Sequence, residues 1–301
     1  MRISTNTLYQ NGISKISSLQ AEQSKLQQQI ASGKRILAPS DDPLAASRVL
    51  QLSQAQSLNT QYANNRKIAI THLSGQDISL ASINELLTST QTNLVGAAGT
   101  LTATQKTVLA TQLSGALGTL LGLANTQDAA GNYMYAGFQN RTKPFAATAT
   151  GASYTGDSNQ QLLQVDGQRQ MAVNLPGDSV FQAGGNDVFT TYKNLIDTLN
   201  NPLSTDATIA TTVAAAISSI KDANSNVALV RSSVGSKLNE IDALNDVGTS
   251  RDLQYAQSMS SLQDLDYAQA LSDIAQKQTI LEAAQKSFVK ITSLSLFDFI
   301  R

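Results

Sequence analysis

The stretch Leu73-Ser-Gly-Gln-Asp-Ile-Ser-Leu-Ala-Ser-Ile-Asn-Glu-Leu-Leu87 decides the fold class of this 301-residue chain. Its apolar residues recur at intervals of three, four and seven, which is the period of one face of an α-helix. Leu94, Ala97 and Leu101 continue the same heptad spacing. The pattern predicts a long amphipathic helix from Leu44 to about Val95.

Proline and glycine divide the chain into three regions. No proline occurs between Leu44 and Lys143 or after Pro202, and proline breaks helix interiors. Eight of the 18 glycines lie between Gly131 and Gly185. The chain is therefore expected to be helical, then rich in turns, then helical again. Further helices are expected over residues 105–128, 187–199, 207–244 and 253–295.

Both ends of the chain carry heptad seams. A helix over residues 5–32 is predicted to end at Gly33, and Asp42-Pro43 is a good start for the next helix. The N-terminal seam consists of Ile16, Leu19, Gln23, Leu26 and Ile30. Near the C-terminus, four residues recur every seven positions and two more support them: Tyr267, Ile274, Leu281 and Phe288, with Leu271 and Ile291.

The middle of the chain is predicted to be β. Two runs of strand-forming residues, 162–165 and 168–173, flank the dipeptide Asp166-Gly167. This dipeptide suits the two positive φ angles of a type I′ hairpin turn, so Gly167→Val is expected to strain it. Residues 174–178 are expected to form another turn.

These elements predict a mainly α protein with a β-rich insertion. The expected architecture is an elongated bundle of long helices, with terminal helices paired as a coiled coil and a small central β domain. This architecture divides the chain into five predicted segments. They are an N-terminal assembly segment (1–42), the first half of a helical rod (43–130), the β-rich domain (131–200), the second half of the rod (201–262) and a C-terminal assembly segment (263–301).

Composition argues against several classes of function. Lys+Arg 21 and Asp+Glu 22 give a formal charge of −1, so the basic footprint of a general nucleic-acid binder is lacking. The chain has no cysteine and one histidine, His72, which makes Cys-type or His-type metal sites and thiol chemistry improbable. No metal, no cofactor and no enzymatic activity are expected.

The paired acids have structural explanations. Asp41 and Asp42 are expected to cap a helix, and Asp264 and Asp266 point different ways on a helix. The most apolar stretch, residues 115–124, has ten residues where a membrane span needs about 20, so no membrane insertion is expected. The N-terminus lacks the apolar core of a cleaved signal peptide.

An assembly interface is the one candidate functional site. A terminal apolar cluster usually marks an interface, so we expect the two terminal helices to pair with each other and then with copies of the chain. The residues assigned to this interface are Ile3, Leu8, Ile16, Leu19, Leu26, Ile30, Tyr267, Leu271, Ile274, Leu281, Phe288, Ile291, Leu294, Leu296 and Phe297.

Several motifs resemble the bacterial flagellin superfamily. Residues 1–6 look like its start, and residues 31–46 are similar to the turn between its first two helices. Within this superfamily, Asn132-Tyr-Met-Tyr-Ala-Gly-Phe138 with residues 142–145 resembles the signature after the third helix of the hook–filament junction type. Tyr154-Thr-Gly-Asp157 and residues 174–181 resemble the β region of that type. Residues 264–297 resemble the terminal helix of the family, and residues 186–250 carry no recognised motif.

The resemblance implies a structural adaptor that forms a ring at the hook–filament junction. It also implies export through the flagellar channel, with an uncleaved signal and an export chaperone on the C-terminal helix. The expected partners are copies of the chain, the preceding junction protein, flagellin, the chaperone and the export apparatus. The expected location is the extracellular flagellum. A flagellin-type filament subunit shares the terminal helices and is the alternative, followed by a secreted helical effector or adhesin.

Overall fold

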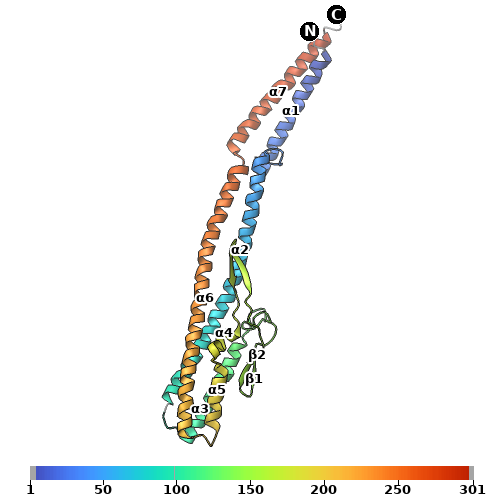
Figure 1. Cartoon of the computed structure of the whole chain (residues 1–301). Coiled ribbons are helices and arrows are strands. Elements are labelled where there is room, and N and C mark those ends of the chain that lie inside the picture. The colour runs from blue at the N-terminus through green and yellow to red at the C-terminus, as the bar shows by residue number, and fades with distance from the viewer. Residues whose placement is uncertain (1–4, 98, 298–301) are drawn as a thin grey trace. The chain divides into compact units, whose positions relative to one another are not determined.

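The computed structural model describes residues 5–97 and 99–297 of the chain. The chain divides into two compact units, and Figure 1 labels their helices and strands. The terminal unit comprises residues 1–58 and 250–301, and the central unit comprises residues 59–249. Each unit is described separately below.

The described chain is mainly helical with a small β region, which confirms the predicted fold class. The long helices are α1 (Thr5–Ser32), α2 (Pro43–Gly96), α3 (Ala103–Ala124), α5 (Val188–Asn200), α6 (Asp206–Gln263) and α7 (Tyr267–Phe297). Two short elements, α4 (Gly177–Phe181) and the 3₁₀ turn η1 (Ala183–Gly185), precede α5. α4 begins inside the stretch that was predicted to be a turn.

The prediction for the last two helices was wrong about where they divide. The sequence pattern indicated a break near residues 245–252, whereas α6 continues to Gln263 and α7 begins at Tyr267. α7 begins after Asp266, whose Oδ1 accepts hydrogen bonds from the amides of Ala268 and Gln269 at 3.0 and 3.1 Å. A side-chain cap therefore starts α7 without any glycine or proline.

Heptad packing forms the core of the central unit. On α2, residues at intervals of seven are all buried: Asn59, Arg66, Leu73, Leu80, Leu87 and Leu94. α6 has the same periodicity, with Val213, Ile220, Val227, Val234, Ile241 and Gly248 buried. The predicted apolar face of α2 is confirmed, and it extends into two polar positions, Asn59 and Arg66.

Polar groups on α2 and α6 meet in the layer around Arg66, which is 2 % exposed. Its Nε donates to Asn245 Oδ1 at 2.6 Å, and its Nη1 donates to the carbonyl of Val165 at 2.9 Å. Asn59 Nδ2 donates to the Gly248 carbonyl at 2.8 Å. A polar layer inside an apolar heptad seam fixes the register of the two helices, because a shift would leave these groups unpaired.

The β region contains two separate antiparallel hairpins. β1 (Phe145–Thr148) pairs with β2 (Gly151–Tyr154), and β3 (Leu162–Asp166) pairs with β4 (Arg169–Ala172). The second hairpin was predicted, but its turn was placed one residue too early. Asp166 pairs with Arg169, so the loop is Gly167-Gln168, and Gly167 does not have a positive φ. The register shift between Gln164 and Asp166 moves the turn and removes the type I′ geometry.

Helix side chains cover the outer edges of the β3–β4 hairpin. The carbonyl of Gln164 on β3 accepts from Asn65 Nδ2 at 2.7 Å, and that of Ala172 on β4 accepts from Lys237 Nζ at 3.2 Å. Gln76 Nε2 donates to the carbonyl of Val173 at 2.9 Å. A hairpin alone is marginally stable, and these bonds attach this one to α2 and α6.

α3 is long and apolar enough to cross a membrane, a test that core helices of soluble proteins also pass. The stretch 115–124, which is too short to span a membrane, is only the most apolar part of this helix. In the central unit, α3 packs against α5 and buries Leu109, Leu113 and Leu120. These buried side chains contribute to the core of the unit, although only 28 % of the most apolar window of α3 is buried.

Candidate assembly site

The two terminal helices pack against each other in the terminal unit, as the α1 and α7 ribbons show (Figure 1). The predicted α1 seam is half-buried at Ile16, Leu19, Leu26 and Ile30. On α7, the half-buried apolar positions include Ile274, Leu281 and Phe288. The structure thus brings seven of the predicted interface residues together in one helix pair.

Other predicted interface residues lie outside this seam. Tyr267, Leu271 and Ile291 are 50, 56 and 60 % exposed. Ile3 and the side chains of Leu8, Leu294, Leu296 and Phe297 lie outside what the structure describes. Sequence reasoning missed Ala270, which is 3 % exposed and is the most buried apolar side chain among residues 267–291 of α7. Its position four residues before Ile274 was the available signal.

The turn that follows α1 and the turn that precedes α7 are hydrogen-bonded to each other. The amide of Arg35 donates to the Gln263 carbonyl at 2.7 Å, and the amide of Leu265 donates to the Gly33 carbonyl at 3.0 Å. Gly33 ends α1 with a φ of 70°, as predicted for a helix stop. The segments between α1 and α2 and between α6 and α7, over 200 residues apart in sequence, therefore form one backbone-bonded junction.

Of the two acids expected to cap a helix, Asp42 does so and Asp41 does not. Asp42 Oδ1 accepts from the amide of Ala45 at 3.0 Å and caps α2. Asp41 instead holds the turn, since its Oδ2 accepts from the amides of Leu37 and Ala38 at 3.0 and 3.1 Å. The hydrogen bond from Lys25 Nζ, 2.6 Å from Oδ1, together with these amides lowers the pKa of Asp41 to about 2.

The motifs of the β region pack around one tyrosine. The Tyr154 hydroxyl lies 3.0 Å from the Tyr135 carbonyl and 2.8 Å from that of Asp157. Burial raises the pKa of Tyr154 to about 12. Gly137 has a φ of 69°, and the next amide, that of Phe138, donates to Asp157 Oδ1 at 3.0 Å. These residues build the fold of the β region.

His72 borders a cavity of about 50 Å³ that is also lined by Gln76, Asp128 and Asn132. Asp128 Oδ1 already accepts from the amides of Ala130 and Asn132, at 2.9 Å each. Among the described residues, no group of three or more His, Cys, Asp or Glu side chains is placed to hold a metal ion. The carboxylate near His72 is thus part of a turn.

Known proteins give the family of the chain. The family model for the bacterial flagellin N-terminal helical region matches residues 3–140. Flagellar hook-associated protein 3 of Escherichia coli K12 is 34 % identical over 99 % of both chains. The protein of the same name from Salmonella typhimurium LT2 is 34 % identical over the full length of both.

Solved structures share the fold at lower identity. A putative flagellar hook-associated protein from Vibrio parahaemolyticus, 23 % identical, superposes with a TM-score of 0.69 and covers 74 % of this chain and 100 % of its own. The flagellar junction protein FlgL from Legionella pneumophila, 17 % identical, has a TM-score of 0.61 and covers 72 % of this chain and 100 % of its own. The identity across the full length decides the assignment: the chain belongs to the flagellar hook-associated protein 3 family of the flagellins and is a structural component of the bacterial flagellum.

Proposed function

We propose that this protein is the adaptor ring subunit between hook and filament, and that the terminal helices are its assembly element. The observation that carries the proposal is the exposed apolar surface beside the α1–α7 seam. Leu271 and Ile291 remain exposed on α7 although the helix is already paired. Burial of one such side chain contributes about 1.5–3 kcal/mol, so contact with neighbouring subunits is favourable.

The same proposal covers the interface residues as a set. Ile16, Leu19, Leu26, Ile30, Ile274, Leu281 and Phe288 hold the helix pair, while Tyr267, Leu271 and Ile291 contact neighbouring copies. Ile3, Leu8, Leu294, Leu296 and Phe297 extend this surface. The five-segment division of the chain, with assembly segments at 1–42 and 263–301 and a rod and β domain between them, belongs to the proposal.

The proposed partners follow from the place in the flagellum. They are further copies of the chain, the preceding junction protein on the hook side and flagellin on the filament side. Before assembly, the chain passes through the export apparatus with a chaperone on its C-terminal helix and is secreted to the cell exterior. The role is mechanical and involves no catalysis; the relatives named above are structural flagellar proteins.

The exposed apolar residues of α7 allow a direct test of the proposed assembly surface. The double variant Leu271→Ser and Ile291→Ser removes apolar surface outside the α1–α7 seam, so its thermal unfolding is expected to match that of the parent. Cells that make it should secrete it but shed flagellin from hooks that lack filaments. Leu229→Ser, at a 71 % exposed position on α6 of the central unit, is the matched control. Normal filaments on cells with the double variant would contradict the proposal.

A further inference from the structure

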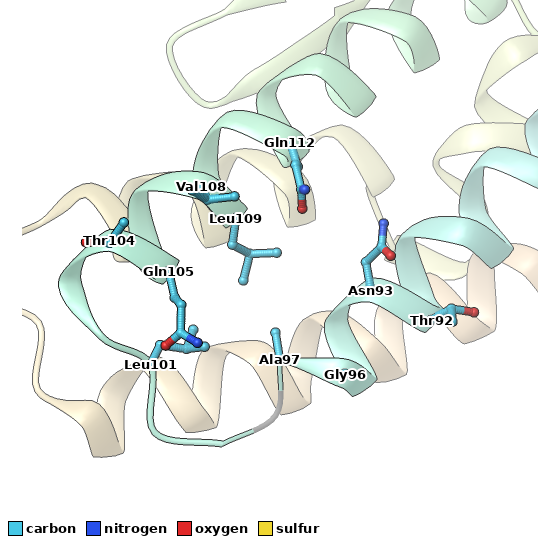
Figure 2. A pocket seen from close by; sticks show the side chains of 10 residues that line it. All are labelled: Thr92, Asn93, Gly96, Ala97, Leu101, Thr104, Gln105, Val108, Leu109 and Gln112. Carbon is cyan, nitrogen blue, oxygen red and sulfur yellow. The ribbon is translucent and has the colours of Figure 1, made fainter.

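A groove of about 400 Å³ lies between the last turns of α2 and the first turns of α3 in the central unit (Figure 2). Ala97 and Leu101 line it from the connecting segment, and Val108 and Leu109 line it from α3. Leu109 is 6 % exposed, whereas Val108 is 52 % exposed. The groove therefore has an apolar floor and an accessible apolar wall.

The groove contains no ionisable side chain. Its polar lining consists of hydroxyl and amide groups, including Asn93 and Gln112, which Figure 2 shows facing the space between the two helices. Gln105 is already occupied in the capping box of α3, where its Oε1 accepts from the Thr102 amide at 2.9 Å. A charged group buried here would have no countercharge, so the groove fits a neutral, apolar occupant.

The loop between α5 and α6 carries a side chain of that kind. Leu203 is 86 % exposed, more than any other large apolar side chain of the described residues. Its amide donates to Asn201 Oδ1 at 3.0 Å, and the amide of Ser204 donates to the Asn201 carbonyl at 3.1 Å. The loop sequence Asn200-Asn-Pro-Leu-Ser-Thr205 contains no ionisable residue. Leu203 is thus an apolar side chain presented on a locally bonded, uncharged turn.

The groove and Leu203 lie at the same end of the central unit. Lys106 Nζ near the start of α3 is 2.8 Å from Asp206 Oδ1 at the start of α6. Figure 1 shows the α2–α3 and α5–α6 connections together at this end. Because Leu203 is exposed, it does not fill the groove of its own chain.

We infer that Leu203 of one copy inserts into the α2–α3 groove of a neighbouring copy. The contact joins two different surfaces, so it is heterologous, and repetition of a heterologous contact closes a ring or continues as a helix. Because the two surfaces are different, each copy can insert its Leu203 into one neighbour and receive a leucine from another. This inference rests on the proposed ring function and assigns it a second contact, separate from the terminal helices.

The absence of cysteine from the sequence makes a cross-linking test clean. Full-length Leu203→Cys and Val108→Cys proteins would be produced together in cells that lack the parent, and hooks with filaments would be isolated and oxidised. A disulfide forms only where the Cα atoms are within about 7 Å. The expected result is a heterodimer that joins Cys at 203 to Cys at 108. The control pair, Leu229→Cys with Val108→Cys, should give none.

Two results would overturn the inference. One is a predominant homodimer of the Leu203→Cys protein, which would mean that the tips meet symmetrically. The other is filaments that contain both variants without the heterodimer, which leaves the proposed function intact while excluding this contact. Hooks that never acquire the parent protein would instead refute the proposed function, and the inference with it. As a second measurement, Val108→Asp should keep the parent melting temperature yet reduce the number of filaments per cell.

Discussion

The ring of Phe288 on α7 lies against the backbone of Gly12 on α1. A Cβ built on Gly12 would be 2.5 Å from Cδ2 of that ring, closer than side chains tolerate. Tyr9, one turn earlier on α1, flanks the same ring with a centroid distance of 5.2 Å. The close approach of the two terminal helices at this point therefore depends on the missing side chain at position 12.

Substitution of two helical glycines by alanine is expected to have opposite effects. Gly12→Ala should reduce hydrogen-exchange protection in α1 and α7, because the new methyl group displaces Phe288. Gly235→Ala on α6 meets no atom within 4 Å, so it should stabilise the central unit by about 0.5–1 kcal/mol, the usual gain over glycine in a helix. Equal protection in parent and Gly12→Ala would show that the ring moves aside without cost.

Phe288→Ser is expected to disturb the terminal unit and to leave the stability of the central unit unchanged. It removes the contact with Tyr9 and Gly12, so exchange in α1 and α7 should become faster. Melting of the central unit should stay within about 0.5 kcal/mol of the parent, since its core is formed by other residues. Secreted Phe288→Ser protein should leave hooks without filaments. An early melting transition of the central unit would instead place Phe288 in its core.

Apolar periodicity predicted most of the long helices, but it could not reveal the polar layer. Arg66 and Asn59 occupy the same heptad positions as Leu73 and Leu80, and a pattern search for apolar residues passes over them. Their burial depends on partners on α6 and β3, which are about 100 or more residues away in sequence. The helix break before Asp266 was likewise hidden, because no glycine or proline marks it and its partners lie in the distant α1–α2 turn.

The sequence alone did not separate the residues that hold the α1–α7 pair from those that stay exposed. Heptad spacing identified residues on the correct helices, but it assigned Tyr267 and Leu271 to the same seam as Leu281. In the structure Leu271 is 56 % exposed, the Tyr267 hydroxyl lies beside Gly33 at the end of α1, and Ala270 is buried. Small side chains carry little hydrophobic signal, so close helix contacts made through alanine and glycine are visible only once the helices are paired.

The polar layer predicts a strong effect from one methyl group. A Cβ at Gly248 would be 2.4 Å from Nη2 of the buried Arg66. Gly248→Ala is therefore expected to lower the free energy of unfolding by about 1–3 kcal/mol, despite its better helix propensity. Arg66→Met should lower it by about 2 kcal/mol or more, because the Val165 carbonyl loses a buried donor. Chemical denaturation measures both, with Gly235→Ala as the control.

Glycines in the β region are expected to differ just as sharply. Gly167→Ala should change the free energy of unfolding by less than about 0.5 kcal/mol, because its φ is not positive and its Cβ would meet no atom within 4 Å. Gly137→Ala requires the left-handed φ of 69° and puts the methyl group 2.2 Å from the Asp157 carbonyl oxygen. It should cost roughly 1–2 kcal/mol for the φ angle alone. Similar denaturation midpoints for the two variants would contradict this assignment.

Acid is expected to loosen the turn between α1 and α2 in a narrow pH range. The Asp41 carboxylate has a pKa of about 2 in the folded chain, below the ordinary value of 3.8 for an aspartate, because it accepts hydrogen bonds from Lys25 and from the amides of Ala38 and Leu37. A lowered folded pKa means that the stabilisation is present above about pH 4 and is lost as the pH falls toward 2. Exchange at the amides of Leu37 and Ala38, measured by NMR, should accelerate over that interval beyond the intrinsic pH dependence. Asp41→Asn should remove the step and leave both amides less protected at neutral pH, because the variant lacks the charge that binds Lys25. A step that survives in Asp41→Asn would assign it to another carboxyl group, such as Asp42, which caps α2 next to this turn.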